Sequence, residues 1–392
     1  EEVIEEVEEV IEEVSSDPLV LASLMPLSGD LASLGPGIAL GAALAVEQIN
    51  AAGGINGQPV VLIEGDSGCD GAVALTSLND VIAQGAQGVM GAACSGTSLA
   101  ILDTAIAAEV VMVSPSNTSP QFTKIDKKGF YARTAPSDLL QGDVLASLLV
   151  EDGVQTVSII SRADSYGRGL AEATAAAFEA AGGTVKTIVY HATDATEFTS
   201  EVTAVGKGGA DAIVGILFPE TGCGVLQPAF EQGLLDTPWY MTDGVKDAGL
   251  ASLCGLGTAL DGFKGTAPGS AAGEAKDAFE AAYAGVSADG SPTFIFAPQA
   301  YDAVMLMAIS AAANGVTGPE IASGLVAASS GGEKCIGVAC IALAADGVDV
   351  DYVGASGEIE LNAVGDPTAA TYDIWTTEGD TNPVLKSVDF GS

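Results

Sequence analysis

The fold of this chain is decided by residues 88–120, GVMGAACSGTSLAILDTAIAAEVVMVSPSNTSP. The pattern predicts an apolar strand that enters the small-residue turn 91–98, and then a helix over 98–109. A second apolar strand over 110–113 ends in the hydroxyl-rich turn 114–120. Backbone N–H groups at a helix start lack intrahelical partners and carry partial positive charge. Two such turns side by side therefore predict a site for an anionic group.

Each of these turns also has a plainer interpretation. Ser98 is a suitable N-cap for the predicted helix, and the serines and prolines of 114–120 are typical of a loop. The interpretation as a binding site depends on the two turns occurring together, and on the fold that surrounds them.

The alternation of strand and helix continues on both sides of this stretch. The predicted strands lie at residues 19–24, 60–64, 88–90, 110–113, 156–161, 185–190, 212–217 and 239–241. The predicted helices lie at residues 39–52, 72–84, 98–109, 139–151, 169–181, 199–206, 225–232, 272–284, 297–313 and 319–328. Continuously apolar strands separated by amphipathic helices indicate parallel strands that are buried on both faces. We therefore predict an α/β fold of the doubly wound type.

The chain is long enough for two such units, because 392 residues exceed one ordinary core. We predict an acidic leader or spacer at 1–17, one lobe from 18–135 plus 264–352, and a second lobe from 136–263 plus 353–392. The chain would then cross between two doubly wound parallel-sheet lobes through a three-strand hinge, with crossings near residues 136, 263 and 353. Ligands of open α/β sheets lie beyond the carboxyl ends of the strands, so the predicted site is the cleft between the lobes.

The charge balance argues against several classes of partner. Thirteen basic and 52 acidic residues give a formal net charge of −39, which repels phosphate backbones and anionic lipid surfaces. Nucleic acid is therefore not an expected partner. No apolar run reaches the roughly 18 residues that a membrane-spanning helix needs.

The first 14 residues are the heptad EEVIEEV written twice. Its valines form a heptad seam, but two heptads make a marginal helix in water, and the glutamates repel each other along it. We interpret this segment as an exposed leader, and a small oligomerisation or docking helix is the alternative.

Six cysteines provide a second constraint. They lie at Cys69, Cys94, Cys223, Cys254, Cys335 and Cys340. They lack the paired spacing of a zinc site, and the chain has one histidine, so we expect no metal centre. Pairing each cysteine with the next closes only short or moderate loops, which predicts the disulfides 69–94, 223–254 and 335–340 and an oxidising compartment. Six cysteines allow 15 pairings, and buried free thiols are the alternative.

The sequence offers little support for an enzyme. His191 lies at a predicted strand end, and no Gly-x-Ser-x-Gly elbow supplies a nucleophile for it. Neither a phosphate-binding loop nor a dinucleotide fingerprint is present. The acidic run 346–351 lacks the spacing of a calcium-binding loop. We therefore expect neither catalytic residues nor a cofactor.

Several short motifs, in order along residues 19–375, resemble a known family. They are Pro26-Leu27-Ser28-Gly29, residues 47–57 (EQINAAGGING), Cys69 with Cys94-Ser95, residues 114–120 (SPSNTSP), Tyr166-Gly167, Asp243-Gly244, Tyr301-Asp302-Ala303 and Gly354-Ala355-Ser356-Gly357. The set resembles the extracytoplasmic solute-binding proteins of branched-chain amino acid ABC importers. These are leucine/isoleucine/valine-binding proteins with a two-lobe, type I periplasmic-binding fold.

The resemblance implies a role for each of five residues. Ser95 and Thr118 would hold the α-carboxylate of an amino acid or related zwitterion. The backbone carbonyl of Ser116 and the carboxylate of Asp243 would take its α-ammonium group, and Tyr166 would close over the ligand from the second lobe. Donors then face the anionic end and an acceptor charge faces the cationic end.

The residues that would select the ligand side chain depart from the family pattern. Leu34 stands where the family often has an aromatic residue, and Phe218 aligns with a family tyrosine. Glu220 is interpreted as a charge at a helix N-terminus, with a position facing the ligand as the alternative. Trp239 and Phe294 are interpreted as core or interface aromatics.

The implied function is capture of the ligand by hinge closure, followed by delivery to the permease subunits of an ABC importer. The protein would act as a monomer in the periplasm, or anchored by lipid on the outer face of the cytoplasmic membrane, with its export signal already removed. The alternative is a ligand-sensing or surface-assembly module of the same fold, docked through its acidic leader.

Overall fold

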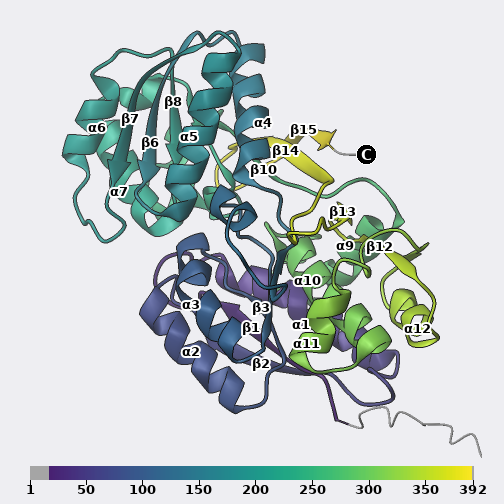
Figure 1. The fold of residues 1–392 in the computed structure, drawn as a ribbon. Coiled ribbons are helices and arrows are strands. Elements are labelled where there is room, and N and C mark those ends of the chain that lie inside the picture. Colours follow the sequence, from purple (N-terminus) through teal and green to yellow (C-terminus); the bar gives the residue numbers. More distant parts are fainter. Residues whose placement is uncertain (1–16, 391–392) are drawn as a thin grey trace, which may run out of the picture.

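The computed structural model describes residues 17–390, which form two α/β lobes (Figure 1). The early part of the chain, drawn in purple, and the later green part lie together in lobe 1, and the teal middle part forms lobe 2. The predicted leader, apart from Asp17, lies outside the described residues.

Lobe 1 is built on a five-stranded parallel sheet of order β2-β1-β3-β4-β5. Its strands are β1 (Val20–Met25), β2 (Val61–Asp66), β3 (Gly88–Gly91), β4 (Val111–Ser114) and β5 (Tyr131–Arg133). Its helices are α1 (Gly35–Ala51), α2 (Gly71–Ala83), α3 (Ser95–Ala107), α9 (Glu274–Val286), α10 (Ala297–Asn314), α11 (Gly318–Gly324) and α12 (Ala339–Ala345). A small sheet of β11 (Glu333–Ile336), β12 (Val350–Gly354) and β13 (Gly357–Glu358) lies beside them.

Helix α10 is the centre of lobe 1, because all of its residues from Ala297 to Ala311 are buried. A helix that is apolar on every side can be stable only when it is covered on every side. Helix α1 packs against it so closely that a Cβ atom at Gly41 would lie 2.2 Å from the carbonyl oxygen of Ala297. Glycine at that position therefore sets the distance between the two helices.

Lobe 2 contains a seven-stranded sheet of order β15-β14-β10-β9-β8-β6-β7. Its strands are β6 (Thr156–Arg162), β7 (Thr184–His191), β8 (Ala212–Ile216), β9 (Trp239–Met241), β10 (Lys264–Pro268), β14 (Ala370–Thr376) and β15 (Val384–Phe390). Its helices are α4 (Asp138–Glu151), α5 (Ser165–Ala180), α6 (Thr199–Gly206), α7 (Pro219–Glu231) and α8 (Leu250–Leu253). The pairs β10–β14 and β14–β15 are antiparallel. This sheet is therefore mixed, whereas a parallel sheet was predicted.

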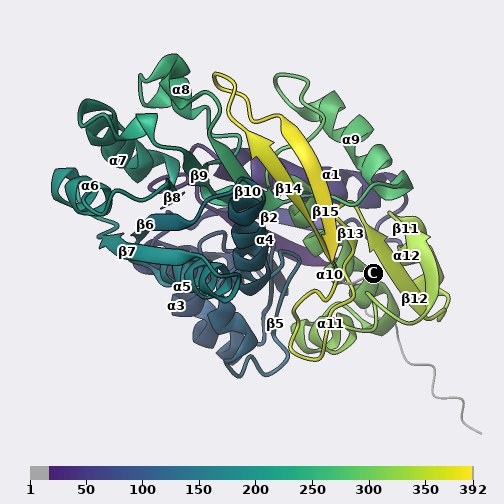
Figure 2. The ribbon, with the colours of Figure 1, turned by 90° about the horizontal axis from the view of Figure 1, so that it is seen from above.

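The chain passes between the lobes through three crossover segments, at 134–137, 269–273 and 359–369. Two of them differ from the expected positions. Strand β10 pairs with β9 of lobe 2, so the second crossing follows this strand and does not precede it. Strand β13 pairs with β12, so the third crossing also comes later. Seen from above in Figure 2, the yellow strands β14 and β15 continue the sheet next to β10.

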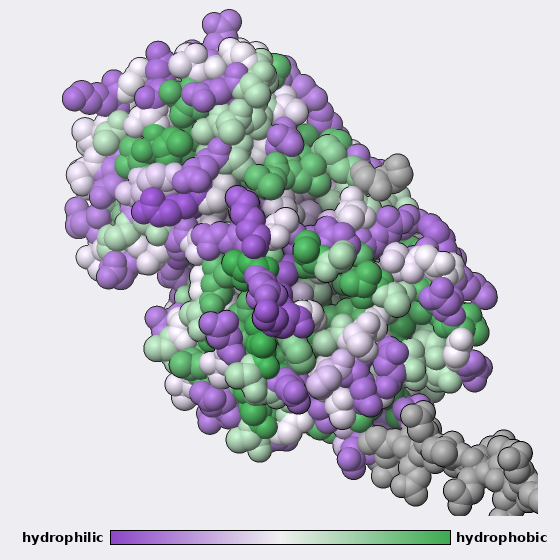
Figure 3. Space-filling model, viewed as in Figure 1, coloured by the Kyte–Doolittle hydropathy of each residue, from purple (hydrophilic) through white to green (hydrophobic). Residues whose placement is uncertain are grey.

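The three disulfides join the cysteines in the predicted pairs. They are Cys69–Cys94, Cys223–Cys254 and Cys335–Cys340, and the described residues contain no free cysteine. The first bond ties the segment after β2 to the start of α3. No helix within residues 17–390 is long and apolar enough to cross a membrane. Hydrophilic residues are spread over both lobes on the face shown in Figure 3.

Candidate ligand-binding site

The two turns of the stretch 88–120 are held together at the carboxyl edge of the lobe 1 sheet. The side chains of Ser114 and Asn117 donate to the carbonyl of Ala92, at 2.8 and 3.0 Å. Asn117 also donates to Ala93 at 2.7 Å, and the hydroxyl of Ser116 donates to the same carbonyl at 3.1 Å. These hydroxyl and amide groups therefore hold the two turns against each other. The role expected for Ser116 concerns its carbonyl, which this bond does not involve.

Helix α3 begins at Ser95, three residues before its predicted start. Cys94 is the N-cap in an extended conformation, and its carbonyl accepts the first helical bond from the N–H of Ser98 at 3.0 Å. Ser98 is not the N-cap, because it is the fourth residue of the helix, and its hydroxyl donates to the carbonyl of Ala92 at 3.2 Å. The N–H groups of the first turn, at 95–97, thus precede the helical hydrogen bonds and can serve an anion.

Asp243 is the main acidic group of the cleft, and it follows β9 of lobe 2. It is 4% exposed and accepts hydrogen bonds from Gln141 Nε2 at 2.7 Å and from the Tyr166 hydroxyl at 3.0 Å. Tyr166 also lies 2.8 Å from the hydroxyl of Thr242. Burial raises the pKa of Asp243 to about 6, against the opposing effect of these hydrogen bonds. No lysine or arginine in residues 17–390 forms an ion pair with this carboxyl group.

A second buried acid, Asp138, was missed in the sequence. It is the first residue of α4, and its N–H donates to the carbonyl of Thr118 at 2.8 Å. The Asp138 carboxyl group is fully buried, and the side-chain hydroxyl of Thr118 lies close enough to it to favour its ionised form. Burial, and then the nearby Asp243, raise the pKa of Asp138 well above its ordinary value.

A signal for Asp138 and Gln141 was present in the sequence. Both lie in the first turn of α4, directly after the first crossover and its Ser137 N-cap. An acid at a helix N-terminus has a plain electrostatic explanation, so the position attracted no functional role. Only the three-dimensional fold shows that this helix start faces Asp243.

One cavity of about 20 Å³ brings together five of the six residues expected to bind the ligand. They are Ser95, Ser116, Tyr166, Phe218 and Asp243. Its remaining walls include the apolar side chains of Leu31, Ile38 and Phe296. Thr118 does not line this cavity and is completely buried. The volume suits about one water molecule, so the lobes lie in contact around the site.

Phe218 forms an aromatic wall with Tyr166. It is the N-cap of α7, and the two rings stack with their centroids 5.4 Å apart. The guanidinium group of Arg162 lies 3.9 Å from the centroid of Phe218 and forms ion pairs with Asp30 at 2.7 Å and Asp164 at 2.9 Å. Arg162 is therefore already neutralised by carboxylates of the protein itself.

Glu220 contacts the opposite lobe. Its carboxylate accepts from the N–H of Leu31 at 2.9 Å and from the hydroxyl of Ser33 at 3.1 Å. It does lie in the first turn of α7, as interpreted from the sequence, but it is occupied by lobe 1 and not aimed at a ligand. Together with the Arg162–Asp30 ion pair, these contacts form what we call the interlobe latch.

Two α/β lobes, three crossovers and a buried cavity between the lobes that contains one carboxyl group define a two-lobed binding protein. Comparison with known proteins supports this class. The sequence profile of one family, described as periplasmic binding protein, matches residues 18–334. The chain belongs to this family.

Two named relatives are about 30% identical to the chain over the regions that match. An amino acid binding protein of Pseudomonas aeruginosa is 33% identical over 245 residues, which is 60% of this chain and 63% of that protein. A leucine-, isoleucine-, valine-, threonine- and alanine-binding protein of the same organism is 29% identical over 316 residues, 78% of this chain and 81% of that protein. The matched region thus spans less than two thirds of the first relative.

Solved structures show the same type I periplasmic-binding fold. A leucine-binding protein, LivK, of Thermotoga maritima superposes with a TM-score of 0.80 at 20% identity, over 94% of this chain and 98% of that chain. The protein LivJ of Streptococcus pneumoniae, in complex with isoleucine, has a TM-score of 0.80 at 22% identity, over 96% and 100%. A solute-binding protein of R. palustris with 4-hydroxybenzoate has a TM-score of 0.79 at 19% identity, over 96% and 98%.

Proposed function

We propose that this chain is an extracytoplasmic solute-binding protein that captures a small amino acid or related zwitterion between its lobes. The observation that supports this most strongly is the buried carboxyl group of Asp243, which forms no ion pair within residues 17–390 and shares a cavity with the start of α3. An ammonium group would supply the missing charge, and a carboxylate would meet the helix N-terminus. A zwitterion satisfies both ends of the site.

In this proposal each polar group has one role. Ser95 and Thr118 donate to the ligand carboxylate, and the carbonyl of Ser116 and the carboxylate of Asp243 accept from the ammonium group. Tyr166 orients Asp243 through the 3.0 Å hydrogen bond. Thr118 does not line the cavity, so this role requires its side chain to turn toward the ligand as the cleft opens and refills.

The apolar walls favour an aliphatic side chain. Leu31, Ile38, Phe218 and Phe296 line the cavity, and no charged side chain other than Asp243 does so. The names of both Pseudomonas relatives agree with an amino acid ligand. An aromatic acid such as 4-hydroxybenzoate would bring no cation to Asp243. Aromatic acids are therefore the second candidate class of ligand, after amino acids.

Further parts of the proposal come from the family. The chain would deliver its ligand to ABC permease subunits, act outside the cytoplasm as a monomer, and carry out no chemical reaction. The position at the periplasm or on the outer face of the cytoplasmic membrane agrees with three disulfides, which persist in oxidising compartments.

Isothermal titration of the ligand-free protein tests the assignment. We expect L-leucine, L-isoleucine or L-valine to bind, and 4-hydroxybenzoate not to bind. Asp243→Asn should weaken binding at least about 30-fold, because a charged hydrogen bond in a desolvated site is worth roughly 2 kcal/mol or more. The matched control is Asp143→Asn, which removes an exposed carboxylate from α4.

Two results would overturn the amino acid assignment. One is tight binding of 4-hydroxybenzoate with no heat from any α-amino acid. The other is amino acid binding that Asp243→Asn and Asp143→Asn affect equally.

A further inference from the structure

A second and larger cavity lies behind the hinge. Its volume is about 320 Å³, which is within the range of small-molecule sites. It shares no lining residue with the cleft cavity. Figures 1 and 2 place α3 and α5, which flank the cleft, on one side of the crossovers, and α9 and β13, which flank this cavity, on the other.

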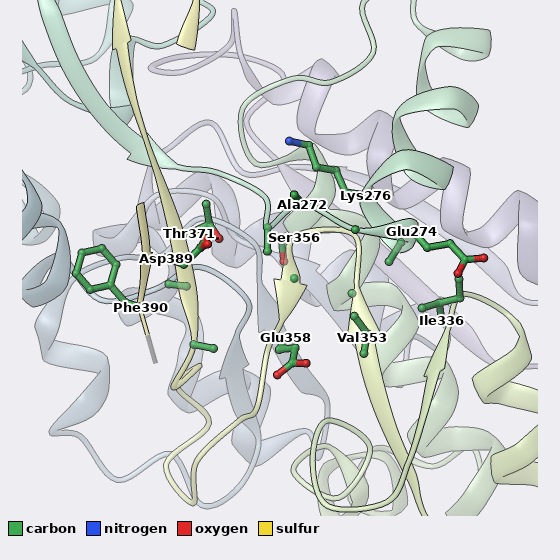
Figure 4. Close-up of a pocket in the computed structure, with 17 residues that line it drawn as sticks. Ala272, Glu274, Lys276, Ile336, Val353, Ser356, Glu358, Thr371, Asp389 and Phe390 are labelled. Carbon is green, nitrogen blue, oxygen red and sulfur yellow. Dashed lines mark hydrogen bonds between the residues drawn. The ribbon is translucent and has the colours of Figure 1, made fainter. Parts of the chain in front are cut away.

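Both lobes contribute walls to this hinge cavity (Figure 4). Thr371 and Phe390 come from β14 and β15 of lobe 2, and Ile336 and Val353 from the small sheet of lobe 1. Its lining includes parts of the second and third interlobe connections, at 271–273 and Ala369. The second connection is hydrogen-bonded to lobe 1, because the Ala271 N–H donates to the carbonyl of Ser356, between β12 and β13, at 3.1 Å. Movement of the lobes must therefore change the shape of the cavity.

The charged groups of the hinge cavity favour a cation. Three carboxylates and one ammonium group line it, from Glu274, Glu358, Asp389 and Lys276. Glu358 is paired with Lys334, and Lys276 lies 3.7 Å from Glu280 on its own helix.

Two of the carboxylates can still accept from a ligand. Glu274, in the first turn of α9, has no hydrogen bond from another side chain within residues 17–390. Asp389 accepts one, from Thr371 at 2.6 Å, and a carboxylate can accept several. In Figure 4 the Glu274 and Asp389 groups lie on opposite sides of Ser356, with the apolar side chains of Ile336, Val353 and Phe390 between and around them.

We propose that the hinge cavity binds a small organic amine with an apolar body. The ammonium group is held by Glu274 or Asp389, and the body covers Ile336, Val353 and Phe390. An anion of the same shape is excluded, because the local carboxylates and the net charge of −39 repel it.

Occupancy of this site is coupled to the cleft. The cavity is formed with the lobes in contact, and a hinge that opens the cleft on one side compresses the opposite side. An amine in the hinge cavity therefore stabilises the closed arrangement, and by linkage it raises the affinity for the cleft ligand. This consequence rests on the proposed function, whereas amine binding itself does not.

Titration with cyclohexylammonium chloride tests the site, with sodium cyclohexanecarboxylate as the anion of matched shape. We expect the amine to bind with a dissociation constant on the order of 1 mM, and the carboxylate not to bind. The double variant Glu274→Gln with Asp389→Asn should weaken amine binding roughly three- to tenfold, as expected for two exposed ion pairs. Asp277→Asn is the control, since it removes an exposed carboxylate from α9 that does not line the cavity.

The cleft variant Asp243→Asn distinguishes the two sites. Amine binding that survives in Asp243→Asn and falls in the double variant supports the hinge cavity. Three results overturn the hinge-cavity site. They are loss of amine binding in Asp243→Asn, unchanged amine binding in the double variant, and binding of the carboxylate as tight as that of the amine. With saturating amine the dissociation constant of L-leucine should fall, and an equal constant with and without amine contradicts the coupling. If no amino acid binds at all, the proposed function fails, while the amine titrations still decide the hinge cavity.

Discussion

If Asp243 takes the ligand's ammonium group as proposed, its carboxyl group must exchange a proton for that cation, and ligand binding should depend on pH. Burial raises the pKa of its carboxyl group to about 6, so in the empty protein it is protonated below that pH and ionised above it. An ammonium ligand binds the ionised form and must displace the proton at lower pH. We expect the affinity for L-leucine to fall about tenfold between pH 7.5 and pH 5. Titrations in buffers of different ionisation enthalpy should also show uptake of a proton by the buffer at pH 5.

Asp243→Asn is the control for this pH effect. Its remaining affinity, measured with high ligand concentrations, should change little over the same range. A wild-type affinity that stays constant from pH 7.5 to pH 5 would show that the carboxyl group does not carry the ligand's positive charge.

Asp302 explains why two of the sequence motifs occur together. It lies on α10 and accepts from Tyr352 and from the N–H groups of Ala355 and Ser356, at 2.7, 2.7 and 2.9 Å. A Cβ atom at Gly354 would lie 2.6 Å from its carboxylate, so glycine is needed where the segment passes. The motif around Asp302 thus anchors the segment that leads into the third crossover.

Asp302→Asn should destabilise the protein by about 2 to 3 kcal/mol. The new amide group can face the two N–H donors with only one oxygen, so buried donors lose an acceptor. Urea unfolding measures this as a lower transition midpoint with an unchanged slope. Asp103→Asn, at an exposed position of α3, should stay within about 0.5 kcal/mol of the wild type. Equal midpoints for both variants would contradict the anchoring role.

At the scale of the elements, the disulfides differ in the length of chain that they close. Cys335 and Cys340 are 5 residues apart in sequence, and Cys223 and Cys254 are 31 apart. The entropy that a cross-link removes from the unfolded chain grows with loop length, and amounts to about 2 kcal/mol for the short loop and about 3.7 kcal/mol for the long one. Replacement of each pair by alanine should therefore lower the urea midpoint more for 223–254.

The comparison is matched, because each pair contains one cysteine that is at most 2% exposed, Cys254 and Cys340. The packing lost on replacement is then similar. A larger loss of stability for the short loop would mean that local packing, and not chain entropy, determines what these bonds contribute.

The elements also show what the sequence could predict. The buried parallel strand β8 is a continuous apolar run, and β6 is apolar at its centre, so the predicted limits of both agree with the structure to within one residue. Helices α3, α5 and α7 begin three to six residues earlier than predicted, because their first turns lie at the cleft and consist of small and polar residues. Strand β15 was not predicted, since it is an exposed edge strand in which Lys386, Ser387 and Asp389 interrupt the apolar residues.

The candidate site could be predicted only in part, for a related reason. Ser95, Asp243 and Tyr166 lie in short motifs that resemble a family, and the structure brings them to one cavity. Asp138 has no such motif, and its importance comes from burial next to Asp243, which depends on how the first crossover orients α4. Long-range juxtaposition of this kind leaves no local pattern in a sequence.

At the scale of the whole molecule, we expect the interlobe latch to control how readily the cleft opens. The carboxylate of Glu220 reaches across to the backbone of Leu31, and Arg162 pairs with Asp30. Arg162 keeps its second partner, Asp164, when Asp30 is neutralised, so that variant does not leave a buried cation alone. The latch residues do not include the groups proposed to hold the ligand's charged ends. Its strength should therefore change the rate of opening more than the chemistry of recognition.

Glu220→Gln and Asp30→Asn should each speed the release of bound L-leucine about fivefold, because each removes roughly 1 kcal/mol of contact that exists only when the lobes meet. Release is measured by chasing labelled leucine with an excess of unlabelled leucine, and the radius of gyration of the empty variants should increase in X-ray scattering. Glu231→Gln, at the exposed far end of α7, is the matched control for charge. If the association rate falls and the release rate stays constant, the latch acts on ligand entry, and its role in holding the closed cleft is wrong.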